Sequence, residues 1–217
     1  SAQIGTRFPS EKKIVKDPVT GTELTFLTSL NKGDSKIYQT HNQWTSDGKW
    51  VIFRSNRVRG EAFAVNEETG VIVQVTEGGY TGMLNVARKS MKLYFMRNTP
   101  REPGSGPRFG GPVQVIEVDL AKLFTDSDAG KLKPASEYQR ICGTTPAEMG
   151  AGGDMALDAD EQVVYFRVGR EESAKHLPDT VKAEPAFGPR KMGAGPAGLG
   201  SMNLKTGETK FIVAVPF

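Results

Sequence analysis

The stretch Trp44–Arg54 reads WTSDGKWVIFR, a polar turn followed by a short apolar run that ends in Phe and then Arg. Two later stretches repeat this pattern: Ala87–Arg97 reads ARKSMKLYFMR and Ala156–Arg167 reads ALDADEQVVYFR. A short apolar run after a polar turn is typical of a β-strand entered from a hairpin. Because repeated turn-plus-strand units indicate an array of small sheets, the three stretches predict the blades of a β-propeller.

A second signature accompanies the first. A Thr-Gly pair stands at Thr20–Gly21, at Thr69–Gly70 and at Thr206–Gly207. Glycine at such a place supplies the positive φ angle that a tight hairpin turn requires. The runs that follow the pairs are rich in β-branched residues, which predicts that they are outer strands of blades.

The spacing of the repeats indicates how many blades are present. Phe95 follows Phe53 at about the 40–45 residues of one four-stranded blade, whereas the interval from Phe95 to Phe166 is longer and contains an insertion. The predicted fold class is all-β, a β-propeller of four-stranded antiparallel blades, with helix limited to one turn near Leu120–Phe124. The blades are predicted at residues 37–79, 83–142 and 154–215, with the strand at 17–29 closing a blade.

Residues 1–217 are thus predicted to form a single, partial propeller of about three blades. Closed propellers contain about four to eight blades. Three blades alone leave two sheet edges open, which favours aggregation. We therefore expect the N-terminal part of a longer propeller. The alternative is a β-rich domain that stacks differently or closes by oligomerising.

Composition restricts the function classes. The 217 residues include 25 Gly and 13 Pro, which suits short strands and turns rather than a helical bundle. A net charge of +3 without a Lys/Arg tract gives no support for nucleic-acid binding but fits an acidic ligand. No apolar run reaches the roughly 20 residues that span a bilayer. The single cysteine, Cys142, excludes an intramolecular disulfide.

The repeats also resemble those of known proteins. The turn Asp47–Lys49 and the later Ser55–Arg57 are similar to the WD40-like repeats of TolB-type propellers. More narrowly, residues 14–97, with Asp17–Gly21 and Gln74–Gly78, resemble the first blades of the oligogalacturonate lyase family. This resemblance implies a seven-bladed propeller that cleaves short pectin fragments by β-elimination. It also implies a divalent, manganese-like metal, held mainly by histidines and a glutamine.

The metal ligands of that family lie in its C-terminal half. This chain offers only two histidines, His41 and His176, and a three- or four-ligand histidine site cannot be built from two. We therefore assign no metal ligand and no catalytic residue within the chain, and we expect the catalytic metal site outside it.

His41 is a candidate for substrate binding. It lies in an unusually polar run within the predicted inner strand Ile37–Thr45. The innermost strand of a propeller blade lines the central channel, where a polar side chain can face a ligand. The alternative is a hydrogen bond from His41 to the backbone of a neighbouring blade.

Three arginines, Arg54, Arg97 and Arg167, are further candidates because they end corresponding runs of the repeat. Guanidinium groups bind carboxylates bidentately, so a partial ring of them would suit the uronate groups of a pectin fragment. The alternative is that each arginine pairs with a turn acid such as Asp47 or Asp160.

Two functional hypotheses from different classes follow. The first is an oligogalacturonide lyase-like protein, a polysaccharide lyase of pectin degradation acting on an acidic oligosaccharide. The second is a non-catalytic TolB-like propeller that binds a polysaccharide or a protein partner in the cell envelope. The chain begins at Ser1 without Met, which favours a periplasmic or secreted location after signal-peptide removal, with the cytoplasm as the alternative.

Overall fold

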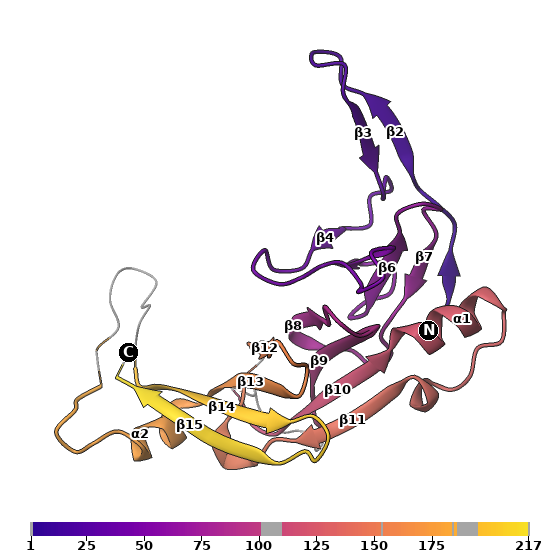
Figure 1. Cartoon of the computed structure of the whole chain (residues 1–217). Coiled ribbons are helices and arrows are strands. Elements are labelled where there is room, and N and C mark those ends of the chain that lie inside the picture. The colour runs from indigo at the N-terminus through magenta and orange to yellow at the C-terminus, as the bar shows by residue number, and fades with distance from the viewer. Residues whose placement is uncertain (1, 101–109, 153, 184, 186–194, 217) are drawn as a thin grey trace. The chain divides into compact units, whose positions relative to one another are not determined.

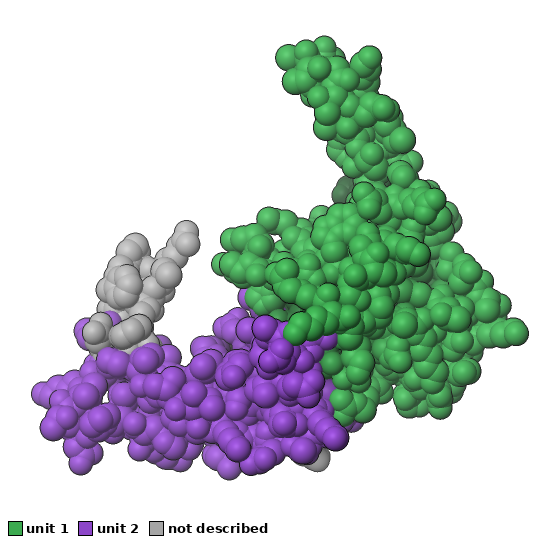
Figure 2. All heavy atoms as spheres, viewed as in Figure 1, with its two compact units in different colours: residues 1–80, 84–94, 117–140 green, residues 81–83, 95–116, 141–217 purple. Residues whose placement is uncertain are grey.

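The computed structural model describes residues 2–100, 110–152, 154–183, 185 and 195–216. These residues form mainly antiparallel β-sheets with a few short helices (Figure 1). The chain divides into two compact units (Figure 2). Unit 1 comprises residues 1–80, 84–94 and 117–140, and unit 2 comprises residues 81–83, 95–116 and 141–217. No helix among the described residues is long and apolar enough to cross a bilayer.

The first sheet has five strands in the order β1-β7-β6-β5-β4 and lies in unit 1. Its buried side carries Phe53, Phe63 and Ile72, and the ring of Phe8 packs edge-on against Phe63 with ring centroids 5.7 Å apart. This apolar cluster is the core that orders the sheet. The strands are β1 (Arg7–Phe8), β4 (Ser35–Lys36), β5 (Trp50–Arg54), β6 (Ala62–Asn66) and β7 (Ile72–Gln74).

The predicted inner strand Ile37–Thr45 was wrong. Only β4 pairs continuously with β5, with Lys36 opposite Phe53, and pairing resumes at a single bridge between Trp44 and Val51. Between these points the chain turns out of the sheet, because the backbone N–H of His41 donates to the carbonyl of Tyr38 at 2.9 Å. A local turn satisfies the polar groups of this run better than a strand ladder does.

Two further sheets have four strands each, as predicted. The second has the order β11-β10-β9-β8 and the third the order β12-β13-β14-β15. Sheets of this kind are the blades of propellers, and the number of blades and their closure stay predictions. The strands are β8 (Thr81–Val86), β9 (Lys92–Asn98), β10 (Val113–Asp119), β11 (Gln139–Thr144), β12 (Met155–Leu157), β13 (Val163–Val168), β14 (Ala197–Asn203) and β15 (Thr209–Val215).

Helix content exceeds the one turn predicted near Leu120–Phe124. Helix α1 (Leu120–Asp128) has nine residues, and the side chain of Asp119 caps it by accepting the N–H of Lys122 at 2.9 Å. Its inward face buries Leu120, Leu123 and Phe124. A second helix, α2 (Arg170–Lys175), follows β13, and two short 3₁₀ helices occur at Ala135–Glu137 and Ala147–Met149.

The segment predicted to close a blade lies in a separate hairpin. Strands β2 (Lys13–Lys16) and β3 (Glu23–Phe26) form a two-stranded sheet in which Lys13 faces Phe26. Both strands are exposed along their length. That residues 17–29 close a blade therefore stays a prediction.

The Thr-Gly turns share one hydrogen-bond pattern. In Asn66–Gly70 the side-chain oxygen of Asn66 accepts the N–H groups of Glu68 and Thr69, and the N–H of Gly70 donates to the carbonyl of Asn66 at 2.8 Å. The turns Asp17–Gly21 and Asn203–Gly207 repeat this arrangement, with Asp17 or Asn203 as acceptor. The last glycine has φ near +73° in each, the left-handed conformation that glycine alone adopts without strain.

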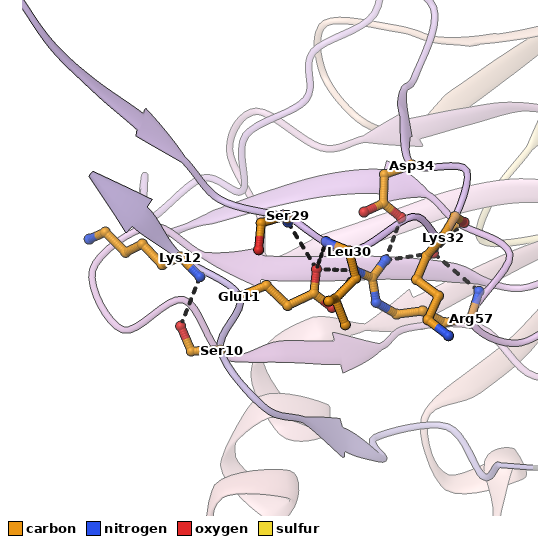
Figure 3. Close-up of polar contacts among 9 residues, drawn as sticks. Ser10, Glu11, Lys12, Ser29, Leu30, Lys32, Asp34 and Arg57 are labelled. Atoms are coloured by element: carbon orange, nitrogen blue, oxygen red, sulfur yellow. Dashed lines mark hydrogen bonds and ion pairs between the residues drawn. The ribbon is translucent and has the colours of Figure 1, made fainter. Parts of the chain in front are cut away.

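A buried ion network joins the base of the hairpin to the first sheet (Figure 3). Nη2 of Arg57 lies 2.6 Å from both carboxylate oxygens of Glu11, and its Nη1 contacts Asp34. The side chain of Arg57 is only 3 % exposed. Burial raises the pKa of the Glu11 and Asp34 carboxyls, but hydrogen bonds from Arg57 and neighbouring groups outweigh it, so both pKa values lie below their usual range.

The turn glycines lead to a first prediction. A Cβ on residue 70 would collide with Oγ of Ser10, whereas a Cβ on residue 48 would meet nothing within 4 Å, although Gly48 has a similar φ of 71°. Both Gly→Ala variants should lose about 1–2 kcal/mol for the left-handed backbone. We expect Gly70→Ala to unfold at clearly lower urea concentration than Gly48→Ala in urea titrations. Equal midpoints would contradict the packing of Ser10 on this turn.

The ion network leads to a second prediction. Arg57→Gln leaves two carboxylates without their cation, so we expect a loss of about 3 kcal/mol in the free energy of unfolding at pH 7. Because the folded pKa values of Glu11 and Asp34 are depressed, their stabilising contribution is complete above pH ~4–5 and is lost as pH falls through those values. The deficit of the variant should therefore shrink on acidification.

Urea unfolding followed by tryptophan fluorescence at neutral and acidic pH measures this effect. The matched control is Arg59→Gln, which removes an exposed arginine two residues away. A deficit that stays constant from pH 7 down to pH ~2–3, below the ordinary carboxyl pKa values of about 4, would exclude the network as its source.

Candidate functional site

The three candidate arginines occupy comparable places in their sheets. Arg54 is the last residue of β5, Arg97 the next to last of β9 and Arg167 the next to last of β13. Each of these strands is second from one edge of its sheet, next to β4, β8 or β12. The repeat in the sequence therefore places an arginine near the same end of three successive sheets.

This placement argues against pairing with the turn acids. Asp160 precedes β13 whereas Arg167 lies near its end, so about 20 Å of extended strand separates them. Arg167 instead pairs with Asp154, with Nε and Oδ2 3.6 Å apart. Asp47 accepts hydrogen bonds from Thr45 and from the N–H of Lys49 inside its own turn. The acids thus stabilise the turns at the opposite strand ends.

A cavity of about 740 Å³ opens at the Arg167 end of unit 2. In antiparallel sheets the start of one strand lies beside the end of its neighbour. Thr81 starts β8, Asn98 ends β9 and Val113 starts β10, so all three lie at one sheet end and contribute to the cavity. The remaining lining residues are Gly110, Gly111, Ala147, Glu148, Gly150, Ala151, Gly152, Arg167, Gly169, Arg170, Glu171 and Glu172.

Glycines allow three chain segments to approach closely beside this cavity. A Cβ on Gly110 would lie 2.5 Å from the carbonyl oxygen of Gly150, and one on Gly169 would lie 3.2 Å from the same oxygen. The backbones of these segments therefore touch directly. A wall made of backbone presents peptide groups to a ligand, and such groups can hydrogen-bond hydroxyls.

Gly152 provides space for the candidate arginine itself. A Cβ on this residue would lie 2.8 Å from Nη2 of Arg167. The N–H of Gly152 also donates to the carbonyl of Arg167 at 3.1 Å. Gly152 thus both holds the backbone of Arg167 and leaves room for its guanidinium group, and the Arg167 side chain is 63 % exposed.

Positive and negative charges line the cavity together. Arg170 forms no ion pair with any described residue, so its guanidinium remains available. Glu172 is already paired, because Lys175 and His176 both donate hydrogen bonds to its carboxylate. These hydrogen bonds hold the pKa of the Glu172 carboxyl below its usual range. Glu148 and Glu171 also line the cavity and can accept hydrogen bonds from hydroxyl groups. The lining therefore combines guanidinium donors, which suit an acidic group, with carboxylate acceptors, which suit hydroxyl groups.

The other candidates lie elsewhere among the described residues. His41 is half-buried in the turn between β4 and the bridge at Trp44, where its ring stands edge-on to Tyr38 at 6.2 Å and Nδ1 lies 3.2 Å from Oγ1 of Thr40. Arg54 is half-buried in unit 1 near Tyr80, where burial raises the pKa of the Tyr80 hydroxyl and the charge of Arg54 opposes this rise. The guanidinium of Arg97 lies 5.6 Å from the ring of Phe95.

Of the four candidates, only Arg167 lines this cavity. Sequence reasoning missed Arg170 and Gly152. A signal for Arg170 was present in the run Arg167–Arg170 (RVGR), which places a second arginine directly beyond the strand end. Gly152 carries no such signal, because its close approach to Arg167 exists only in the folded chain.

No metal centre is present among the described residues. They contain no group of three or more His, Cys, Asp or Glu side chains arranged to hold an ion. His176, one of two histidines, stacks on Phe211 with ring centroids 3.7 Å apart and bonds Glu172. The described residues therefore do not fit a histidine-held divalent metal.

Comparison with solved structures identifies proteins that share this fold. No protein-family model and no curated protein matches the sequence. Among solved structures, an oligogalacturonate lyase in complex with manganese matches 99 % of this chain and 50 % of its own, with 19 % identity and a TM-score of 0.67. An oligogalacturonate lyase from Vibrio parahaemolyticus matches 99 % of this chain and 49 % of its own, with 16 % identity and the same TM-score.

A TolB structure from Agrobacterium tumefaciens also matches, at 12 % identity over 94 % of this chain and 61 % of its own, with a lower TM-score of 0.44. This chain spans about half the length of the lyases that it matches. The expected resemblance is thus confirmed at the level of fold: the chain shares its fold with about half of oligogalacturonate lyase.

Proposed function

We propose that this chain is part of an oligogalacturonide lyase-like β-propeller and that its unit 2 cavity binds the uronate groups of short pectin fragments. The observation that carries the proposal is the pair of arginines, Arg167 and Arg170, at a cavity of about 740 Å³. The fold likeness to oligogalacturonate lyase over 99 % of the chain supports it. Location in the periplasm or outside the cell belongs to the same proposal.

The chemistry of the ligand suits this cavity. Each galacturonate unit carries one carboxylate, so a short oligomer is an anion with several hydroxyls. Guanidinium groups bind carboxylates with two parallel hydrogen bonds, and the charge assists each bond. Glu148, Glu171 and the glycine-lined backbone offer partners for the hydroxyls. The cavity would therefore orient a uronate through its carboxylate and recognise its sugar ring through hydrogen bonds to the hydroxyls.

In this proposal the described residues bind the pectin fragment and do not cleave its glycosidic bond. Cleavage by metal-assisted β-elimination would require metal ligands beyond those described, because no suitable cluster occurs among them. The manganese in the lyase structure is a property of that protein. In the proposal, Arg167 and Arg170 neutralise and position a carboxylate, and no proton-transfer step is assigned to this chain.

Binding of trigalacturonate, measured by isothermal titration calorimetry, tests the proposal. We expect saturable binding, and binding of fully methyl-esterified trigalacturonate about tenfold weaker, because esterification removes the charge but keeps the rings. Adding manganese and following the ultraviolet absorbance of the unsaturated product separates a lyase from a binding protein. Equal affinity for the acid and its ester would overturn the proposal.

Arginine variants assign the binding to the cavity. We expect Arg167→Ala and Arg170→Ala each to weaken trigalacturonate binding by roughly tenfold, because each removes one charge-assisted contact. The matched control is Lys205→Ala, which removes a positive charge from the Thr-Gly turn at the opposite end of the same sheet. If Lys205→Ala weakens binding as much as the arginine variants do, general charge attraction explains the affinity and the cavity assignment fails.

Gly152 offers a more selective variant. An alanine there would displace the guanidinium of Arg167 by the side-chain clash described above. We expect Gly152→Ala to weaken trigalacturonate binding severalfold while the urea unfolding midpoint stays close to that of the wild type, since the clash involves a mobile and largely exposed side-chain end. Unchanged binding would show that the position of Arg167 does not matter for the ligand.

A further inference from the structure

A second cavity, of about 440 Å³, lies within unit 1 at the base of the β2-β3 hairpin, and Figure 3 shows the polar contacts of several of its lining residues. It shares no lining residue with the proposed uronate site, whose residues all belong to unit 2. One wall is the segment Phe8–Lys13 and the opposite wall is the loop Ser29–Lys32, with Arg57 between them. The volume falls within the range of pockets that bind small molecules, about 300–1,000 Å³.

The two walls are fixed to each other by one carboxylate. Oε2 of Glu11, in the first wall, accepts the N–H groups of Ser29 and Leu30 in the second wall, at 3.1 and 3.2 Å. Both oxygens of Glu11 also receive Nη2 of Arg57. The side chains of Glu11 and Arg57 are 8 % and 3 % exposed. These buried bonds hold the cavity open in a defined shape before any ligand arrives.

The first wall has two more fixed points. Nζ of Lys12 donates to the carbonyls of Glu67 and Glu68 at 2.8 and 2.9 Å. Ser10 packs directly on Gly70 in the same turn. The Lys12 ammonium is therefore engaged with backbone oxygens, while its aliphatic stem lines the cavity.

The lining combines apolar surface with excess positive charge. Phe8, Pro9 and Leu30 supply apolar walls, and Leu30 is 57 % exposed. The cavity has four cationic side chains, on Lys12, Lys13, Lys32 and Arg57, but only one carboxylate, on Glu11. That carboxylate is already paired with Arg57.

Two of the cations are not paired. Lys13 and Lys32 form no ion pair with any residue in the described part of the chain, and both are exposed. An apolar, water-accessible wall beside unpaired ammonium groups favours a ligand with an apolar body and a negative end.

We propose that this cavity binds a small organic anion with a flat or compact apolar body, of the aromatic carboxylate class. The apolar body would lie against Phe8, Pro9 and Leu30, and the carboxylate would lie between Lys13 and Lys32. Arg57 does not contact the ligand charge, because Glu11 and Asp34 already occupy its guanidinium group. Its role is to position the walls.

The test uses 2-naphthoate as the probe and 2-naphthamide as its neutral counterpart. Titrations at low ionic strength, followed by ligand-detected NMR, give both affinities. We expect saturable binding of 2-naphthoate and roughly fivefold weaker binding of the amide, with the difference diminishing at high salt. The double variant Lys13→Gln/Lys32→Gln should bind 2-naphthoate as weakly as the wild type binds the amide.

Two control variants make the result decisive. Lys131→Gln/Lys205→Gln removes two exposed charges elsewhere and should leave the 2-naphthoate affinity unchanged. Val19→Ser removes an exposed apolar side chain from the turn of the neighbouring hairpin, where Val19 is 90 % exposed, and should also leave it unchanged. Absent binding, equal affinity for acid and amide, or a loss caused by Val19→Ser rather than by the lysine variant would each overturn the proposal. Trigalacturonate binding has no part in this test, so either proposal can fail alone.

Discussion

The sheets of this chain depend on one local constraint, the return of the backbone through a tight turn that only glycine completes without strain. At Asp17–Gly21, Asn66–Gly70 and Asn203–Gly207, a side-chain oxygen accepts the N–H groups of the turn, and the final glycine has a positive φ. This bonding satisfies backbone groups that the strands cannot pair. It also makes successive strands antiparallel, so that strand ends gather at the two ends of each sheet.

That geometry decides where chemistry can occur. The turn acids lie at one end of their strands, and Arg54, Arg97 and Arg167 lie at the other. Loops at the arginine end of unit 2 leave a cavity, and glycines there let backbone segments meet with almost no side chain between them. Polar backbone and guanidinium groups thus share one surface, which is a suitable arrangement for an acidic sugar.

The two cavities are held open by different means. In unit 2, direct contact between glycine backbones sets the walls. In unit 1, a buried arginine and two carboxylates fix them, because desolvated charges tolerate little displacement from their partners. The first arrangement is sensitive to any added side-chain atom, and the second is sensitive to removal of a charge or to acid.

Two elements show how far local sequence signals extend. Asp119 is a capping residue, and the apolar residues Leu120, Leu123 and Phe124 have the spacing of a helix, so the sequence indicates the start of α1, but one turn falls short of its nine residues. The predicted inner strand Ile37–Thr45 is absent for a different reason. Its residues have adequate strand propensity, but the turn at His41 competes with the ladder, and only the packed sheet decides which one wins.

The sequence by itself determined the β-rich class, the positions of the turns and the strand ends that carry arginine, because hydrophobic alternation and turn residues act over a few neighbours. Tertiary structure alone decided that Arg167 and Arg170 border a cavity, that Gly152 makes room for Arg167, and that Glu11 and Arg57 meet across 46 positions. These contacts join residues distant in the chain. No local pattern encodes them, since their energies arise only when packing has excluded water from between them.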